Sequence, residues 1–169
     1  MIPFMKGGNQ EHVIRSGTIN TPCIFGFARA VELTQEASIE KMKFLQQKLY
    51  SLFKESLGDR IMLNGPEDFS RRLFNNLSIV FISVSSEILI SFLDSKNIIC
   101  SGGSACSSDN ETLSPVLNAI GRNLKESRST IRFSLSEYIT KEDIEHTVKT
   151  TLTFLNKTKS NDTTDRSKQ

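Results

Sequence analysis

The chain has 169 residues, a net charge of +2 at pH 7 and a hydrophobic share of 37%. That length fits one domain with its own core, and the interleaved charges provide no face for nucleic acid or anionic membranes. No apolar run is long enough for a bilayer, and the N-terminus lacks the features of a secretory signal. Three irregularly spaced cysteines argue against a disulfide framework and for a reducing compartment, so we expect a cytoplasmic protein.

The first third of the chain changes from a glycine-rich segment to a helical pattern. Residues 1 to about 20 are polar and show neither helix nor strand periodicity. From Pro22 apolar residues recur at helical spacing as far as Gly58. A helix of about 35 residues is long for a globular protein, so we expect a bend or a break between Thr34 and Ser38.

After Gly58 the pattern alternates between short strands and helices. We predict strands at 60–63, 77–82, 98–99 and 130–135, and helices at 87–93, 115–121 and from 141 onward, capped by Ser86, Ser114 and Thr140. Together these elements predict an α+β fold, in which helices cover one side of a small, mostly antiparallel sheet that follows the long helix. Residues 157–169 contain no apolar side chain and predict a disordered tail.

Cys106 lies in a run of small residues, Cys-Ser-Gly-Gly-Ser-Ala-Cys-Ser-Ser-Asp over positions 100–109. A structural cysteine normally packs among apolar neighbours, so this composition predicts an exposed loop with the sulfur near its tip. Such a thiol could reach out, react and move away. The alternative is a Gly/Ser surface loop in which the cysteine has no role.

Three segments resemble one family at matching intervals. Residues 7–18 resemble the Gly-Gly-x-Gln-Glu…Arg-Ser-Gly-Thr segment of pyridoxal-phosphate-dependent cysteine desulfurases, within the class-V aminotransferase superfamily. Residues 101–108 resemble the active-site loop of the subgroup with a long, mobile loop, and residues 129–135 resemble the strand that binds the substrate carboxylate. The resemblance runs from about residue 3 to residue 156 and implies the C-terminal domain of fold-type I pyridoxal-phosphate enzymes.

The resemblance implies a role for three residues. Cys106 would attack the sulfur of L-cysteine, releasing alanine and leaving a persulfide on the enzyme. Arg132 would bind the substrate carboxylate, and Thr18 would donate to the cofactor phosphate across a dimer interface. From the residues alone, Arg132 could equally be an exposed strand arginine, and residues 16–18 an ordinary turn before a helix.

The same resemblance divides the chain. Residues 1–21 would be a remnant of the large domain that contacts the cofactor, residues 22–156 the small domain with its active-site loop at 101–113, and residues 157–169 the tail. The family's Schiff-base lysine, together with the aspartate and histidine that hold the cofactor ring, precedes this segment, and no lysine here matches that position. We expect no metal ligands, because no Cys-x-x-Cys motif or Cys/His cluster is present.

The remaining cysteines and histidines have weaker functional signals. Cys23 follows Pro22 and is expected to pack in the interior, and Cys100, at the end of a predicted strand, is expected to be inert, with a Cys100–Cys106 bridge as the alternative. His12 and His146 do not match the histidine that stacks on the cofactor ring, and His146 is expected on a helix surface.

Three hypotheses follow from the missing lysine. The chain could act with a large-domain polypeptide or a homodimer partner and pass sulfur to an acceptor such as an iron–sulfur scaffold or a protein of tRNA or cofactor thiolation. It could be a cofactor-free persulfide carrier or regulatory module. It could also be an inactive remnant of a split gene. Each hypothesis leaves an apolar face without its large domain, and therefore predicts poor solubility.

Overall fold

The computed structural model describes residues 2–34, 36–103 and 114–165, with side chains as far as Lys157. The chain forms two compact units, Met1–Glu36 and Ala37–Gln169, which are described separately. The first contains a 3₁₀ turn, η1 (Gln10–Val13), and helix α1 (Thr21–Leu33). No helix in the described part of the chain is long and apolar enough to cross a membrane.

Helix α1 has a capped start and an abrupt end. The side chain of Asn20 accepts a hydrogen bond from the Cys23 amide at 3.2 Å, and Pro22 lies in the first turn, where its missing N–H has no helical partner to lose. At Thr34 the backbone becomes extended while the Thr34 hydroxyl donates to the Ala30 carbonyl. The next helix begins at Glu36. The expected break in the long helical pattern is therefore confirmed.

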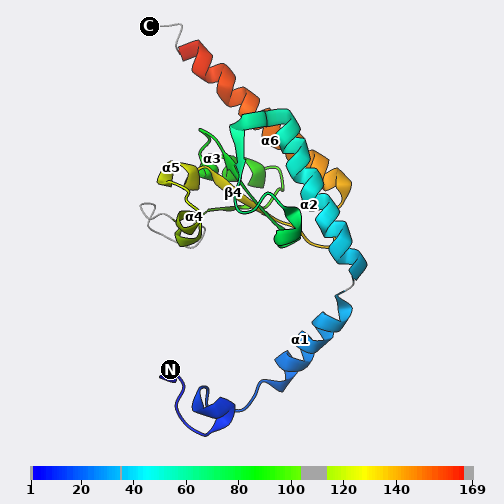
Figure 1. Cartoon of the computed structure of the whole chain (residues 1–169), viewed down its shortest axis with the longest axis vertical. Helices are drawn as coiled ribbons and strands as arrows, with labels where there is room; N and C mark the ends of the chain where they lie inside the picture. The colour runs from blue at the N-terminus through cyan, green and yellow to red at the C-terminus, as the bar shows by residue number, and fades with distance from the viewer. Residues whose placement is uncertain (1, 35, 104–113, 166–169) are drawn as a thin grey trace. The chain divides into compact units, whose positions relative to one another are not determined.

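The second unit is built around one antiparallel sheet. Its strands are β1 (Ile61–Leu63), β2 (Asn76–Phe81), β3 (Ser101–Gly102) and β4 (Thr130–Ser134), in the order β1-β2-β4-β3. Its helices are α2 (Glu36–Leu57), α3 (Ser86–Asp94), α4 (Pro115–Ala119), α5 (Leu124–Ser127) and α6 (Lys141–Asp165), with 3₁₀ turns η2 (Gly58–Arg60) and η3 (Phe69–Arg71). The long helices α2 and α6 lie on one side of the sheet, and α4 and α5 lie on the other (Figure 1). The predicted α+β class is confirmed.

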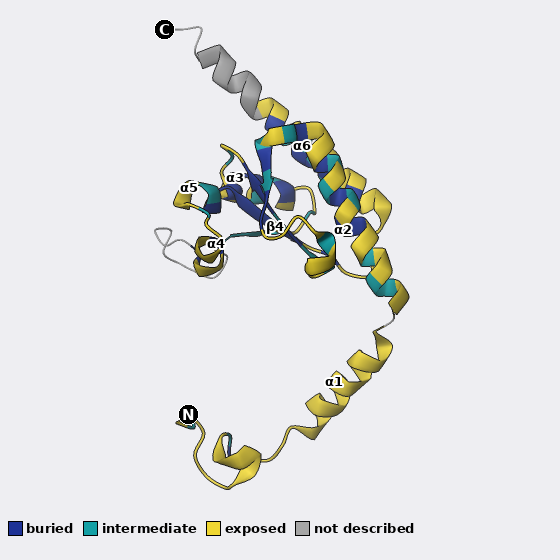
Figure 2. Cartoon of the chain, viewed as in Figure 1, coloured by how far each residue is buried: buried dark blue, intermediate teal, exposed yellow. Residues whose placement is uncertain are grey.

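The core lies between the sheet and the long helices. Alternate residues of β2 and β4 point to this side, where they meet one apolar stripe from each of three helices. Buried strands and half-buried helices are visible in Figure 2. The buried set is Leu45, Leu49, Phe53, Leu57, Ile61, Leu63, Leu77, Ile79, Phe81, Leu89, Leu93, Ile131, Phe133, Leu135, Ile144, Val148 and Leu155. At its centre Phe53 packs against the rings of Phe81 and Phe133, with centroid distances of 5.3 and 5.8 Å.

Two polar contacts join α2 to α6 and to the segment just before it. The ammonium of Lys48 pairs with Glu145, and the ammonium of Lys41 donates to the carbonyl of Glu137 at 2.6 Å. At the start of α6, the Thr140 hydroxyl accepts from the Asp143 amide, and the Asp143 carboxylate accepts from the Thr140 amide. This reciprocal pair confirms Thr140 as the predicted cap.

Several local predictions differ from the structure. The strand expected at 98–99 is wrong, because pairing with β4 begins only at Ser101 and Ile99 is 86% exposed. The residue that caps α3 is Ser85 rather than Ser86, and α5 was not predicted. Helix α6 continues to Asp165, so the backbone is helical over part of the range for which composition predicts disorder.

Candidate functional site

Arg132 lies on the sheet face opposite the core. In β4 it stands between two core residues, Ile131 and Phe133, so the alternation of a strand turns its side chain to the other side. Its register partners are Ser78 of β2 and Ser101 of β3. Directly paired residues share a face, so two serines flank the guanidinium position. The side chain of Arg132 is exposed.

A buried polar network fixes the sheet next to Arg132. The side-chain nitrogen Nδ2 of Asn64 donates to the Ser78 hydroxyl at 3.1 Å and to Thr130 Oγ1 at 3.4 Å. The side-chain oxygen Oδ1 of Asn64 accepts from Arg122 Nε at 2.7 Å. Arg122 Nη2 also donates to the Leu63 carbonyl at 2.8 Å. These bonds tie β1, β2 and β4 to the segment between α4 and α5.

The sequence pattern did not identify this network. The residues Asn64-Gly65-Pro66 predict only a turn, and the position of Arg122 after Gly121 predicts only the end of a helix. Nothing in either pattern indicates that the two side chains meet, because the contact spans 58 positions along the chain. An asparagine at a turn has many local alternatives to such a distant partner.

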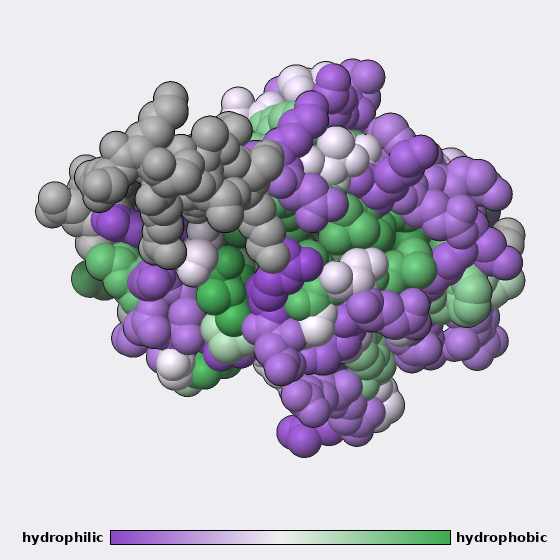
Figure 3. Space-filling model, turned by 90° about the horizontal axis from the view of Figure 1, so that it is seen from above, coloured by the Kyte–Doolittle hydropathy of each residue, from purple (hydrophilic) through white to green (hydrophobic). Residues whose placement is uncertain are grey.

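A cavity of about 240 Å³ opens on the same face as the network. Its lining includes the polar residues Asn64 and Ser78 and the apolar residues Leu73, Val116 and Leu117. Val116 and Leu73 are largely exposed. The lining of this cavity thus combines exposed apolar residues with hydrogen-bonding groups. Apolar residues also reach the surface between hydrophilic ones on the face of the molecule that Figure 3 shows.

Cys106 lies outside the described residues, but the chain on both sides of residues 104–113 is described. Gly103 follows β3, and the buried Ser114 begins α4, where its hydroxyl accepts from the Leu117 amide as the predicted cap. Cys106 lies five positions after Ser101 and three positions after Gly103, the last described residue before it.

Thr18 lies in the first unit, in a turn held by Arg15. Arg15 Nη1 donates to the carbonyls of Gly17 and Thr18 at 3.0 and 2.8 Å, and these two bonds hold the turn. Gly17 has a φ of 105°, which disfavours any residue with a side chain. The Ser16 hydroxyl donates to the Gly8 carbonyl at 2.7 Å. Thr18 itself is exposed.

The other two cysteines have different environments. Cys23 is exposed rather than packed in the interior, so that expectation is wrong. Cys100 packs against the core and is half-buried. Burial, and to a lesser extent the charge of Asp94, raises the pKa of the Cys100 thiol to about 11. At neutral pH this thiol stays protonated, which agrees with an inert residue.

The raised pKa of Cys100 predicts a loss of stability in alkali. Between pH 9.0 and about 11 the unfolded chain has released the thiol proton and the folded chain still holds it, so the free energy of unfolding falls as the pH rises. Urea unfolding at about pH 8 and about pH 10.5 measures this fall. The Cys100→Ser variant should lose less stability over the same interval, and an unchanged slope would contradict the assignment.

Comparison with known proteins places the chain in a family. The family model for aminotransferase class-V matches residues 6–147. The chain belongs to the aminotransferase class-V family. The cysteine desulfurase IscS of Dictyoglomus turgidum is 36% identical over 149 residues, covering 86% of this chain and 37% of that protein. A mitosomal cysteine desulfurase of Encephalitozoon cuniculi is 33% identical over 148 residues, covering 86% and 33%.

Solved structures agree with this placement of the class-V chain. A NifS-like protein superposes with a TM-score of 0.72 at 30% identity, covering 91% of this chain and 39% of that one. A NifS-like protein from Rickettsia africae gives a TM-score of 0.70 at 30% identity, covering 88% and 38%. The chain therefore spans little more than a third of the length of these relatives.

Members of this family depend on pyridoxal phosphate, but the described residues do not form a complete site for it. A Schiff-base lysine needs a buried amine without a competing ion pair. The described lysines are exposed except for Lys48. Lys48 of α2 forms an ion pair with Glu145 of α6. The described residues also contain no cluster of three or more His, Cys, Asp or Glu that could hold a metal ion.

Proposed function

We propose that this chain provides the sulfur-accepting thiol and the carboxylate-binding arginine of a cysteine desulfurase. Cys106 takes the sulfur of L-cysteine, Arg132 binds the carboxylate, and Thr18 contributes to the phosphate site of pyridoxal phosphate across a dimer interface. A large domain beyond these residues holds the cofactor through its lysine. The persulfide then passes to an acceptor such as an iron–sulfur scaffold protein. The observation that carries the proposal is the pairing of Arg132 with Ser101, on the strand that leads to Cys106.

The face around Arg132 supports a carboxylate site. A guanidinium can offer two parallel N–H donors to a carboxylate, and the paired serines place hydroxyl groups beside it. The core residues on either side of Arg132 fix the strand, so the arginine projects from a rigid element. The Asn64 network holds the neighbouring strands in register.

Cys106 reacts as a thiolate in the transfer of sulfur from L-cysteine. Its lone pair forms the new S–S bond while the C–S bond of the substrate breaks, and the released electron pair stays on the substrate carbon, which is then protonated to give alanine. When bound, pyridoxal phosphate supplies the electron sink for that carbon. This chain contributes the nucleophile and the orientation of the carboxylate.

Alkylation of the chain tests whether Cys106 and Arg132 act on one molecule. Iodoacetate carries a carboxylate next to its reactive carbon, and iodoacetamide is its neutral analogue. We expect Cys106 to favour iodoacetate relative to the exposed Cys23. Arg132→Ala should lower the iodoacetate-to-iodoacetamide rate ratio at Cys106 about fivefold, the effect of roughly 1 kcal/mol for a charge pair at 4 Å in water. Peptide mass spectrometry measures both rates.

Two variants separate a specific effect from a general one. Lys125→Ala removes the same charge from the exposed side of α5 and should leave the ratio unchanged. Arg132→Lys keeps the charge without the bidentate fork and should retain part of the preference. An equal ratio in wild type and Arg132→Ala would refute the shared site. Sulfur uptake by Cys106 without any large domain would indicate a persulfide carrier instead.

A further inference from the structure

Gly103 lies in a slot with no room for a side chain. A Cβ atom added at Gly103 would lie 2.6 Å from Leu117 Cδ1, 3.0 Å from the carbonyl oxygen of Ser127 and 3.3 Å from Thr130 Cβ. The three neighbours are themselves buried. Real Cβ atoms essentially never approach another atom more closely than 3.0 Å, so Leu117 would have to shift. The Ser127 oxygen, at a distance tighter than nine in ten real Cβ contacts, belongs to the backbone and cannot rotate away.

The adjacent glycine has a different environment. A Cβ atom added at Gly102 would meet Ile90 Cδ1 at 3.5 Å and the Ser86 hydroxyl at 3.8 Å, both ordinary contact distances. Neither glycine has a φ in the left-handed region. Gly103 is therefore required by space rather than by backbone conformation, and Gly102 is required by neither.

The slot joins the two flanks of residues 104–113. Gly103 is the last described residue before them, and Leu117 belongs to α4, which Ser114 begins immediately after them. The Leu117 amide donates to the Ser114 hydroxyl, so Leu117 is tied to that second flank. Thr130, the third wall, lies two residues before Arg132 on β4. One contact thus relates both flanks to the strand that carries Arg132.

We propose that Gly103 is a positioning residue for Cys106, an inference that rests on the proposed function. Its missing side chain lets β3 end against Leu117, Ser127 and Thr130. This contact sets where the chain leaves the sheet, three residues before Cys106, relative to Arg132. A displacement of about 1 Å at a reacting group can cost about a hundredfold in rate, so the point at which the chain leaves the sheet bears on the reaction of Cys106.

The test compares Gly103→Ala with Gly102→Ala in the full chain. Both variants add one methyl group to neighbouring positions of the same segment. We expect Gly103→Ala to lower the iodoacetate-to-iodoacetamide ratio at Cys106 about threefold or more, toward the value of Arg132→Ala. Gly102→Ala should keep the wild-type ratio. The ratio is used because both reagents depend equally on the thiolate fraction and on the exposure of the sulfur.

The other two thiols distinguish positioning from loss of structure. Cys100 packs against the core, so its alkylation reports opening of the fold, and Cys23 lies in the other compact unit and serves as the reference. Positioning requires the Cys106 ratio to fall while Cys100 stays protected. The second-site variant Gly103→Ala/Leu117→Val removes the Cδ1 atom that the new methyl group meets, and should restore part of the ratio.

The outcomes separate this inference from the proposed function. If the wild-type chain shows no carboxylate preference that depends on Arg132, the proposed function fails. If that preference exists and Gly103→Ala retains it, the positioning role of Gly103 is overturned and the proposed function stands. A ratio that falls only together with labelling of Cys100, and that Leu117→Val does not restore, also overturns the positioning role.

Discussion

Replacing Cys106 with alanine should abolish sulfide release from L-cysteine when the chain is assembled with a large domain that binds pyridoxal phosphate. Under the proposed function this thiol forms the only new bond to the departing sulfur. Loss of the nucleophile in an enzyme of this kind reduces turnover on the order of a thousandfold or more. A methylene-blue assay for sulfide, run with a reductant, measures the loss.

Cys100→Ser and Cys23→Ser are the matched controls for this result. Both remove a thiol from the same chain, one half-buried and one exposed, and neither should change sulfide release by more than about twofold, since surface and boundary substitutions rarely perturb function. Sulfide release by the Cys106→Ala assembly at the wild-type rate would show that another group accepts the sulfur. Loss of release in Cys100→Ser alone would move the acceptor role to that residue.

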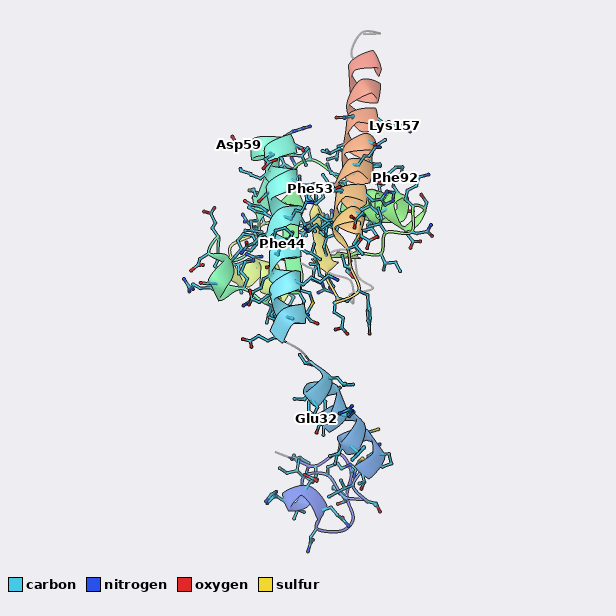
Figure 4. All side chains as sticks on the ribbon, turned by 90° about the vertical axis from the view of Figure 1, so that its right-hand side faces the viewer. Glu32, Phe44, Phe53, Asp59, Phe92 and Lys157 are labelled. Carbon is cyan, nitrogen blue, oxygen red and sulfur yellow. The ribbon has the colours of Figure 1, made fainter. Side chains whose placement is uncertain are left out.

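The largest expected effect on stability comes from Phe53→Ala. Phe53 is fully buried in the C-terminal half of α2 (Figure 4), and its ring packs against the rings of Phe81 and Phe133. Truncation removes the apolar contacts and leaves a cavity that neighbouring side chains fill only in part. The expected loss in the free energy of unfolding is about 3–5 kcal/mol. Chemical denaturation of the wild-type and variant chains measures it.

Phe44 on the same helix provides the comparison. It is 50% exposed, and its ring lies 5.1 Å from the Lys141 ammonium. Phe44→Ala therefore loses a partly solvated cation–π contact and little burial, so the expected cost is about 1 kcal/mol or less. Equal destabilisation by the two variants would contradict the placement of Phe53 in the core.

Elements with a strong internal pattern could be predicted from the sequence. The alternation in β4 places Ile131 and Phe133 on the core side, and Ser114-Pro115 indicates the start of α4. Both signals are local, because the alternation of a strand and the cap of a helix depend on neighbouring residues only. The change of backbone at Thr34 could be anticipated from helix length alone.

Elements defined by distant partners could not be predicted in this way. β3 has two residues, too few for any periodicity, and its position follows from hydrogen bonds to β4. Helix α5 is a single turn set by the reciprocal bonds of Asn123 and Glu126. For the candidate site, the sequence suggested Arg132, Thr18 and Cys106 through resemblance to a family. The Asn64–Arg122 contact and the slot around Gly103 required the folded chain.

The alternation in β4 also restricts which changes of length this strand can tolerate. Ile131 and Phe133 fill the core, and Arg132 between them is exposed on the opposite face of the sheet. Inserting or deleting one residue before Ile131 would exchange the two faces, so the arginine would enter the apolar interior at the same moment as two core side chains left it. Among related sequences, viable length changes within this strand should therefore occur in pairs, or at its ends.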